Sequence, residues 1–149
     1  AALQYQKFEF EPVIWENGKA KVLPTIGTDP DGNAFSVNNQ GHIVGATGSC
    51  TSFQASGDLT YLYGLHATIW IDGAAIEFGN LGSVQPGGGN TAITINNRDE
   101  VVGASGTADG SFHGFYWSKG TGIRDLGTIP GDGASVARLF GIKVGFRWI

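Results

Sequence analysis

The sequence predicts an all-β protein built from antiparallel four-stranded repeat units, about three of them, stacked like propeller blades. A pattern running from Trp through Gly to an Asn pair occurs twice and begins a third time. Repetition at roughly 50 residues is typical of one supersecondary unit stacked on its copies. Gly accounts for 25 of the 149 residues, which favours many tight turns. No segment keeps a helical period. We therefore expect one domain, residues 1–149, with units near 11–66, 67–112 and 113–149.

Each predicted unit opens with a strand that carries a Trp and continues through a hairpin turn. The first strands are expected over Val13–Glu16, Thr68–Asp72 and Phe115–Ser118. The turns are expected at Asn17-Gly18, Asp72-Gly73 and Lys119-Gly120. Asn-Gly and Asp-Gly are strong hairpin signals because a type I′ turn needs positive φ at both central residues. The second strands are expected over Ala20–Leu23, Ala75–Leu81 and Ile123–Leu126.

A second hairpin follows in two of the units, and an Asn pair turns the chain in each. The strands before the turn are expected over Ala34–Val37 and Ala92–Ile95, and those after it over His42–Ala46 and Glu100–Ala104. Asn suits such a turn because it tolerates left-handed backbone and hydrogen-bonds its own turn. The turns at Asn38-Asn39 and Asn96-Asn97 are therefore interpreted as structural, with metal or ligand coordination as the alternative.

Trp15, Trp70 and Trp117 recur at one place in the unit. A Trp repeated in this way indicates a packing anchor between units, because it buries a large apolar area. A ligand platform is the alternative interpretation of the same three residues.

Charge and composition exclude several classes of partner. The net charge is −4 and the basic residues are scattered, so a nucleic-acid partner is not expected. Apolar runs are short and broken, so a membrane span is not expected either. Cys50 is the only cysteine, which permits no internal disulfide and leaves its role open. A first residue other than Met, with no signal-type apolar stretch, suits a mature secreted protein and equally a trimmed chain.

The repeated text resembles the HAF-type extracellular repeat of bacterial proteins. The matching segments are Ile95–Asn97, Val101–Ser105, His113–Trp117 and Asp125–Gly131, with His66–Trp70 one copy earlier. The resemblance implies a propeller-like repeat in a secreted or cell-surface protein. The third copy departs at Arg138-Leu139-Phe140, where another Asn pair would stand. An incomplete array has open edges, so we expect a homo-oligomer, for example two half-rings.

Two groups of residues are candidates for chemistry. Asp29, Asp31 and Asn33, with Asp132 in the corresponding third loop, could hold Ca²⁺, although the first three also read as a plain turn. His66 and His113 occupy the same place in successive units. They are candidate catalytic bases that could meet near a common axis, or structural hydrogen-bonding residues.

Two functions follow from these candidates. The first is a secreted, non-catalytic module that binds a small molecule, a polysaccharide or a partner protein. The second is a Ca²⁺-dependent hydrolase acting on a lactone or another ester, in which Ca²⁺ polarises the carbonyl oxygen and a His or carboxylate activates water. A Gly-x-Ser-x-Gly elbow is absent, which excludes an α/β-hydrolase triad.

Overall fold

The computed structural model describes residues 10–48, 66–83 and 89–135. Within them the regular elements are all strands, and no helix occurs. The first strands, β1 (Val13–Glu16) and β2 (Lys19–Val22), form an N-terminal hairpin. The first sheet contains β3 (Asp31–Val37), β4 (Ile43–Gly48), β5 (His66–Ile71) and β6 (Ala74–Glu77). The second sheet contains β7 (Asn90–Ile95), β8 (Val101–Gly106), β9 (Phe112–Ser118) and β10 (Gly122–Asp125). All pairs are antiparallel, so the predicted all-β antiparallel class is confirmed.

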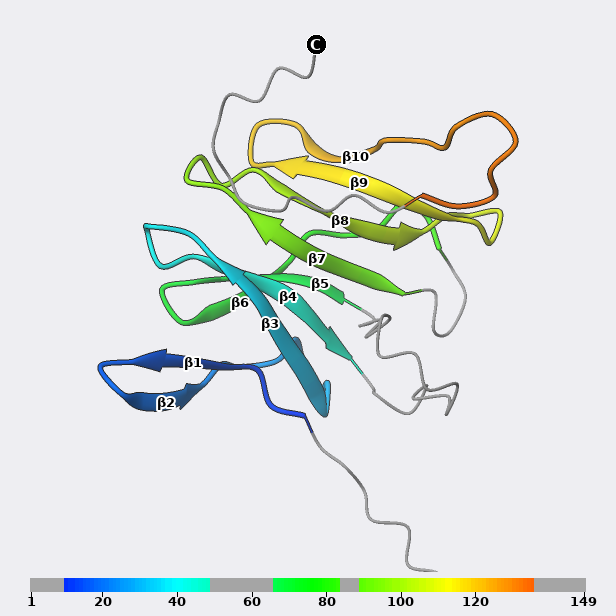
Figure 1. Cartoon of the computed structure of the whole chain (residues 1–149). Coiled ribbons are helices and arrows are strands. Elements are labelled where there is room, and N and C mark those ends of the chain that lie inside the picture. The colour runs from blue at the N-terminus through cyan, green and yellow to red at the C-terminus, as the bar shows by residue number, and fades with distance from the viewer. Residues whose placement is uncertain (1–9, 49–65, 84–88, 136–149) are drawn as a thin grey trace, which may run out of the picture.

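Each sheet is a meander in which neighbouring strands follow one another in the chain. Figure 1 shows the N-terminal hairpin, the first sheet and the second sheet stacked in that order. Each sheet begins with the strand before the Asn pair and ends with the Trp hairpin, so the sheets start at a different point of the repeat from the sequence units. The N-terminal hairpin therefore corresponds to the outer half of a sheet. Cys50 and the predictions made for Arg138–Ile149 lie outside the described residues.

The predicted hairpin turns are present, with one change. Asn17 and Gly18 have φ of 51° and 76°, and Asp72 and Gly73 have 51° and 80°, as a type I′ turn requires. In the third hairpin the positive φ, 67°, falls on Gly122 and not on Gly120. The loop there is longer, because Ser118 pairs with Gly122.

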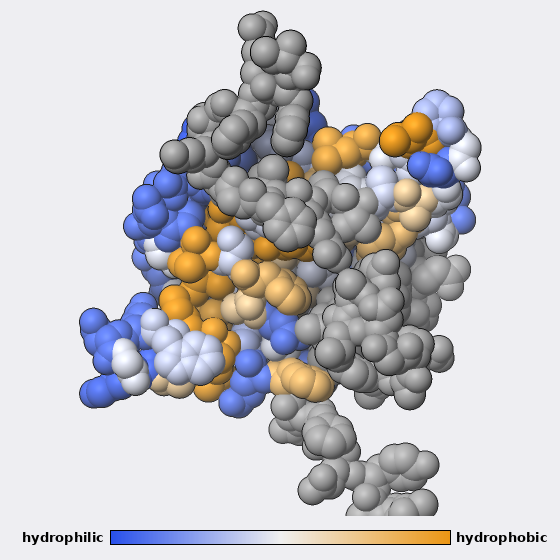
Figure 2. Space-filling model, viewed as in Figure 1, coloured by the Kyte–Doolittle hydropathy of each residue, from blue (hydrophilic) through white to orange (hydrophobic). Residues whose placement is uncertain are grey.

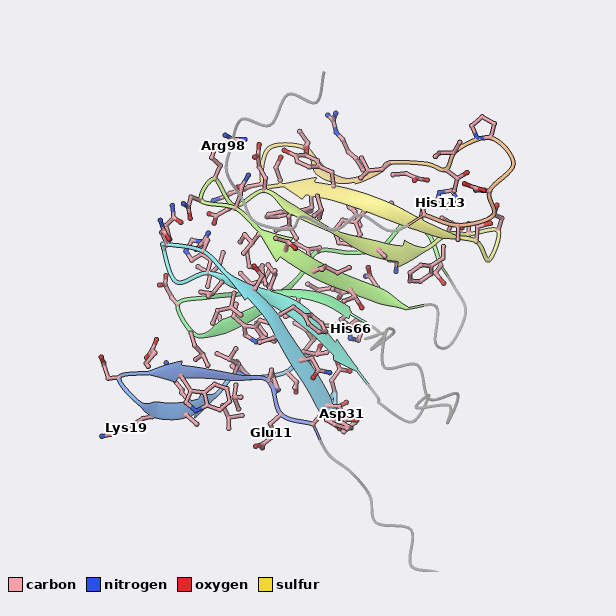
Figure 3. The ribbon with its side chains drawn as sticks, viewed as in Figure 1. Glu11, Lys19, Asp31, His66, Arg98 and His113 are labelled. Carbon is pink, nitrogen blue, oxygen red and sulfur yellow. The ribbon has the colours of Figure 1, made fainter. Side chains whose placement is uncertain are left out.

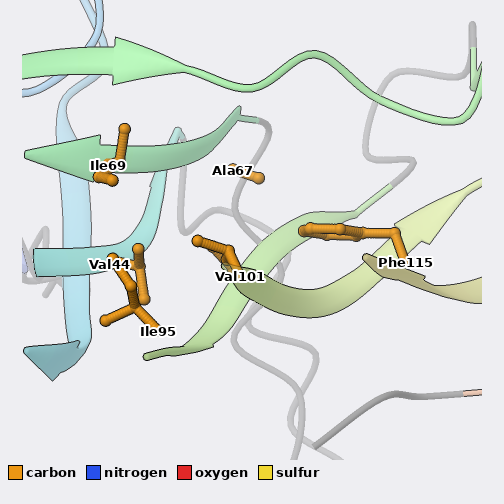
Figure 4. Close-up of a cluster of buried hydrophobic side chains, with 7 residues drawn as sticks. Val44, Ala67, Ile69, Ile95, Val101 and Phe115 are labelled. Atoms are coloured by element: carbon orange, nitrogen blue, oxygen red, sulfur yellow. The ribbon is translucent and has the colours of Figure 1, made fainter. Parts of the chain in front are cut away.

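Strand alternation divides the apolar side chains into two layers. One layer lies between the two sheets and contains Val44, Ala67, Ile69, Ala92, Ile95, Val101 and Phe115 (Figure 4). The other lies between the N-terminal hairpin and the first sheet and contains Leu23, Ile43 and Trp70. Successive residues of a strand point to opposite faces, so Ile69 and Trp70 serve different layers. The first sheet is thus buried on both faces.

The three repeated Trp side chains have different environments. Trp70 is buried, packs with Leu23, and donates its indole N–H to Pro24 O at 2.6 Å. Trp117 is half-buried, with its ring 4.4 Å from that of Phe78. Both contact residues that follow the last strand of the preceding unit, so the predicted packing role is confirmed for these two. The prediction is wrong for Trp15, which is 67% exposed, because the described chain has no earlier unit for it to face.

Backbone contacts repeat where one unit passes to the next. The amide of Gly32, at the start of β3, donates to Phe10 O at 2.7 Å. The amide of Ser135 donates to Phe112 O at 2.8 Å. Phe112 is the counterpart of Phe10, because it lies two residues before Gly114 as Phe10 lies two residues before Pro12. Ser135 is therefore bonded as its counterpart Gly32 is at the start of the first sheet. No helix able to cross a membrane occurs in the described part of the chain.

Candidate functional site

The Asn turns are built alike in both sheets. Asn38 Oδ1 accepts hydrogen bonds from the amides of Gln40 and His42, at 3.1 and 3.0 Å. Asn96 Oδ1 accepts from the amides of Arg98 and Glu100, at 2.8 and 3.0 Å. Both Asn side chains are buried, so these bonds satisfy amides that would otherwise lose their partners.

The expected hydrogen bonds of Asn within its own turn are present, but the expected left-handed backbone at the Asn pair is not. Positive φ falls three residues after the first Asn, on Gly41 at 82° and on Asp99 at 57°. Neither residue of an Asn pair has it. Asn is thus needed for its side-chain acceptor and not for a left-handed backbone.

The two Asn turns are also bonded to each other. Asn38 Nδ2 donates to Asn96 O at 3.0 Å and to Asp99 Oδ1 at 2.7 Å. The Asn39 amide donates to Asn97 Oδ1 at 2.9 Å, and Gln40 Nε2 donates to Asn97 O at 2.8 Å. We call these contacts the turn ladder. Its donors come from the first sheet and its acceptors from the second, so the ladder has a direction.

A His–Asp pair completes the turn ladder. His42 Nδ1 lies 2.8 Å from Asp99 Oδ1, across 57 residues of sequence. At the position of His42 the second sheet has Glu100, whose side chain accepts from Asn96 Nδ2 of its own turn. The ladder therefore does not continue through Asn96, which is consistent with the loss of the Asn pair after Ala137.

Removing the Asn38 side chain should weaken the contact between the two sheets. Asn38→Ala loses the bonds of Nδ2 to the second sheet and the turn bonds of Oδ1, so we expect the free energy of unfolding to fall by about 2–3 kcal/mol. Asn39→Ala is the control, because its contribution to the ladder comes from the backbone amide. Urea unfolding of both variants measures the difference. Equal losses in the two variants would contradict the assigned role of the Asn38 side chain.

The candidate base His66 lies at the start of β5 and is held by Asp29. Its Nδ1 is 2.7 Å from Asp29 Oδ2, and Thr47 Oγ1 donates to the same oxygen at 2.6 Å. The imidazole is 31% exposed and the carboxylate is nearly buried. A carboxylate that binds Nδ1 fixes the ring and leaves Nε2 for exchange with a ligand or water. The sequence placed Asp29 and His66 in separate candidate sites, and the structure brings them together.

His113 forms a separate pair. Its Nδ1 lies 3.0 and 2.9 Å from the two oxygens of Asp125, on the neighbouring strand β10. Figure 3 shows His66 and His113 on different sheets, and no hydrogen bond of the described residues joins them. The two histidines therefore bond to different carboxylates, Asp29 and Asp125.

The four candidate calcium ligands lie in two parts of the fold, three of them at the start of the first sheet and Asp132 after the second. Asp31 and Asn33 lie within β3, so reading them as a plain turn is wrong for these residues; Asp31 is buried and its Oδ1 accepts from the Phe10 amide at 2.9 Å. Asp29 is bonded to His66 and Thr47. Asp132 lies in the loop after β10, at the far end of the stack in Figure 1. Ca²⁺ needs six to eight oxygens around one point. The described part of the chain holds no group of three His, Cys, Asp or Glu side chains suited to a metal. Calcium binding at these residues stays a prediction.

The His113 contact has a measurable electrostatic consequence. The hydrogen bond from His113, with a second bond from the Gly127 amide, lowers the pKa of Asp125. A carboxyl whose pKa is lowered by folding stabilises the fold above its unfolded pKa, and this stabilisation is lost as pH falls through the folded pKa.

We therefore expect His113→Gln to raise the pKa of Asp125 and to reduce the loss of stability in acid. Carboxyl titration by ¹³C NMR measures the first effect, and thermal unfolding against pH measures the second. His66→Gln is the control, because His66 contacts Asp29 in the other sheet. An Asp125 pKa that does not change in His113→Gln would contradict the expectation.

Comparison of the chain with protein-family models, with curated proteins and with solved structures gives no match. The site is therefore interpreted from its own geometry. That geometry includes one His–Asp–Thr cluster and two sheets whose repeated residues bond to each other.

Proposed function

We propose that this chain is a secreted binding module of the HAF type, with its β units stacked in propeller fashion, that binds a partner protein, a polymer or a small ligand and does not catalyse a reaction. The observation that carries the proposal is that the repeated Trp and Asn side chains make contacts between neighbouring units. Trp70 and Trp117 pack against the preceding unit, and Asn38 bonds to the next turn. Residues that hold neighbouring units together have a structural role. Function is therefore expected at the surfaces of the described chain where no further unit packs.

Large apolar side chains are exposed at both of these ends. They are Trp15 and Val22 on the N-terminal hairpin, and Leu126 and Ile129 after β10. Phe35, Val37 and Ile76 are exposed on the first sheet. Figure 2, viewed as in Figure 1, shows apolar side chains on the face toward the viewer and on the loop that follows β10. Exposed apolar patches on a soluble domain are typical of interaction sites. Homo-oligomer formation is one expected use of them.

A binding experiment tests the proposal. The chain is immobilised and probed with a panel of bacterial polysaccharides, with small glycans, and with the soluble chain itself, by interferometry. We expect saturable binding that falls at least ~10-fold in Trp15→Ala, since buried aromatic side chains dominate many interfaces. Ile76→Ala is the control for loss of an exposed apolar side chain. No binding by any member of the panel would count against a binding module.

A hydrolase is the second candidate, and the His66–Asp29 contact favours it. A carboxylate on Nδ1 orients a His for general-base attack of water on an ester carbonyl. The test is turnover of a lactone and ester panel, with Ca²⁺ and with chelator, alongside a thermal-shift titration of Ca²⁺. His66→Ala should abolish turnover, and His113→Ala should not. Absence of turnover by the folded wild-type chain would leave the binding module.

A further inference from the structure

The outer strand of the first sheet, β6, has an open edge. In the described part of the chain it pairs only with β5. The Phe78 amide bonds to Ala67 O, and hydrogen-bonded pairs alternate along an antiparallel ladder. Ile76 therefore bonds to β5, whereas the backbone groups of Ala75 and Glu77 point away from it. An open strand edge of this kind is a template for pairing with another strand.

The charged residue that protects this edge in the other two Trp hairpins is absent from β6. The position after the residue opposite the Trp holds Lys21 in β2 and Arg124 in β10, but Ile76 in β6. Charged side chains on an edge strand discourage pairing with a further strand. Ile76 is instead apolar and 47% exposed. Among the outer strands of the described chain, β6 is thus the one that lacks this protection.

The charged side chains along β6 are acidic. Asp72 lies in the hairpin turn before the strand and Glu77 ends the strand, and both are exposed. Neither carboxylate has an ion-pair partner among the described residues. In β10 the residue at the position of Glu77 is Asp125, which is bonded to His113. The carboxylate of Glu77 therefore remains available to a cation from outside the sheet.

Ile76 and Glu77 lie on opposite faces of the sheet. Ile76 stands opposite Ile69, which is buried against the second sheet. Ala75 stands opposite Trp70, which is buried on the other face. Successive residues of a strand alternate between faces, so Glu77 shares the face of Ala75. A strand added at this edge meets an apolar side chain on one face and a carboxylate on the other, and alternating apolar and basic residues complement both.

The packing of the two sheets leaves the β6 edge uncovered. The first sheet contacts the second mainly through β3, β4 and β5, which lie against β7. β6 is at the opposite edge of its sheet from β3. An added strand therefore extends the first sheet outward without displacing another described strand.

From these observations we propose that the β6 edge binds an extended segment of a partner protein in which basic and apolar residues alternate. The segment joins the first sheet as an additional antiparallel strand. A basic residue lies opposite Glu77 and exchanges backbone hydrogen bonds with it, and an apolar residue lies opposite Ile76. The inference rests on the proposed binding function, and it names the surface and the class of partner.

A strand peptide tests the proposal directly. The ¹⁵N-labelled chain is titrated with a peptide of about eight residues that alternates Lys and Val, the length of one strand. We expect saturable resonance shifts and slower amide exchange at Ala75 and Glu77. The Ile76 amide is bonded within the hairpin, so it should exchange slowly with and without peptide. A peptide with Glu in place of Lys should bind at least ~10-fold more weakly, because like charges then face each other.

N-methylation of the peptide tests the proposed register. The residues opposite Ala75 and Glu77 form the backbone bonds to β6, and in this register they are Lys. N-methylation of the Lys residues should therefore abolish binding, whereas N-methylation of the Val residues should leave it unchanged. Equal binding by the two methylated peptides, or the reverse order, would overturn the assigned register.

Ile76→Lys is the decisive variant. It gives β6 the basic residue that β2 and β10 carry at the same position, so it suits the repeat and should fold. We expect at least ~10-fold weaker binding of the Lys–Val peptide. Glu77→Gln should weaken binding less, and its effect should shrink as salt is added. Ile129→Lys is the matched control and should bind as the wild-type chain does, because Ile129 is an exposed apolar residue after β10. Circular dichroism checks that each variant is folded.

Three results would overturn the site: no binding of the Lys–Val peptide at about 1 mM, equal binding of the Glu–Val peptide, or unchanged binding by Ile76→Lys. Self-association that is lost in Ile76→Lys would assign the edge to a second copy and reject the partner segment. Saturable binding of a glycan without binding of the peptide would reject the β6 site and keep the proposed function. Absence of both kinds of binding would reject both.

Discussion

Replacing Trp70 with Ala is expected to lower the free energy of unfolding by about 3–5 kcal/mol, the range for removing a large buried aromatic side chain. Trp70 is buried between the N-terminal hairpin and the first sheet, where it packs with Leu23 and Ile43. The substitution leaves a cavity there. It also removes the indole donor from Pro24 O.

The repeat supplies the controls for this prediction. Trp15→Ala changes the same residue of the same motif, but at an exposed position, so its effect should stay within about 0.5 kcal/mol. Trp117→Ala should lie between the two, because Trp117 is half-buried against Phe78. Urea unfolding at about 1 μM keeps self-association out of the comparison. Equal losses at Trp15 and Trp70 would show that Trp15 is buried in the monomer.

The second large effect is expected where a Gly lets two strands approach closely. Gly45 in β4 and Gly103 in β8 lie opposite the irregular pairing of β3 and β7, at Ala34 and Ala92. A Cβ on Gly45 would collide with Asn33 O, and one on Gly103 would collide with Thr91 O and lie 2.7 Å from Phe115 Cε1. These obstacles include backbone atoms, which cannot move without breaking strand pairing.

We therefore expect Gly45→Ala and Gly103→Ala each to cost at least ~3 kcal/mol or to prevent folding, the upper range for overpacking a core. Gly120→Ala is the control, because a Cβ there meets no atom within 4 Å and its φ is not positive. Its effect should be within about 0.5 kcal/mol. Soluble yield, circular dichroism and urea unfolding measure all three. A stable, wild-type-like Gly103→Ala protein would contradict the register of β7 and β8.

The regular elements could be predicted because their signals are local. Strands such as β5 and β7 coincide with short β-branched or apolar runs, and Asn17-Gly18 and Asp72-Gly73 mark their turns without help from the rest of the chain. The predicted strand Ala75–Leu81 is too long, since β6 ends at Glu77 and the last bond to β5 is from the Phe78 amide to Ala67 O. Boundaries of this kind depend on the neighbouring strand, which sequence spacing does not show.

The His–Asp pairs could not be predicted in the same way. His42 meets Asp99 across 57 residues, and His66 meets Asp29 across 37. Both contacts depend on which strands and sheets are neighbours. A repeated His is visible in the sequence, whereas the carboxylate that holds it differs from unit to unit. For His113 that carboxylate is Asp125 of the adjacent strand.

The exposure of Trp15 shows the same limit. Its place in the repeat is identical to that of Trp70, so local sequence gives both the same role. The difference arises because a preceding unit covers Trp70 and none in the described chain covers Trp15. Position within the array, and not the motif, decides which repeated residue is available for binding.

The exchange of the Trp indole protons with water, followed by ¹⁵N–¹H NMR as the protein is concentrated, is the most direct test of the account. The indole N–H of Trp70 is bonded to Pro24 O and should be protected at every concentration. That of Trp15 should exchange freely in dilute solution and become protected, with a shifted resonance, as homo-oligomers bury the hairpin. Trp15→Ala assigns the signal. If the Trp15 indole exchanges freely and its resonance does not shift at any concentration, Trp15 is not a binding residue. If the Trp70 indole exchanges as fast as that of Trp15, Trp70 is not buried between the hairpin and the first sheet.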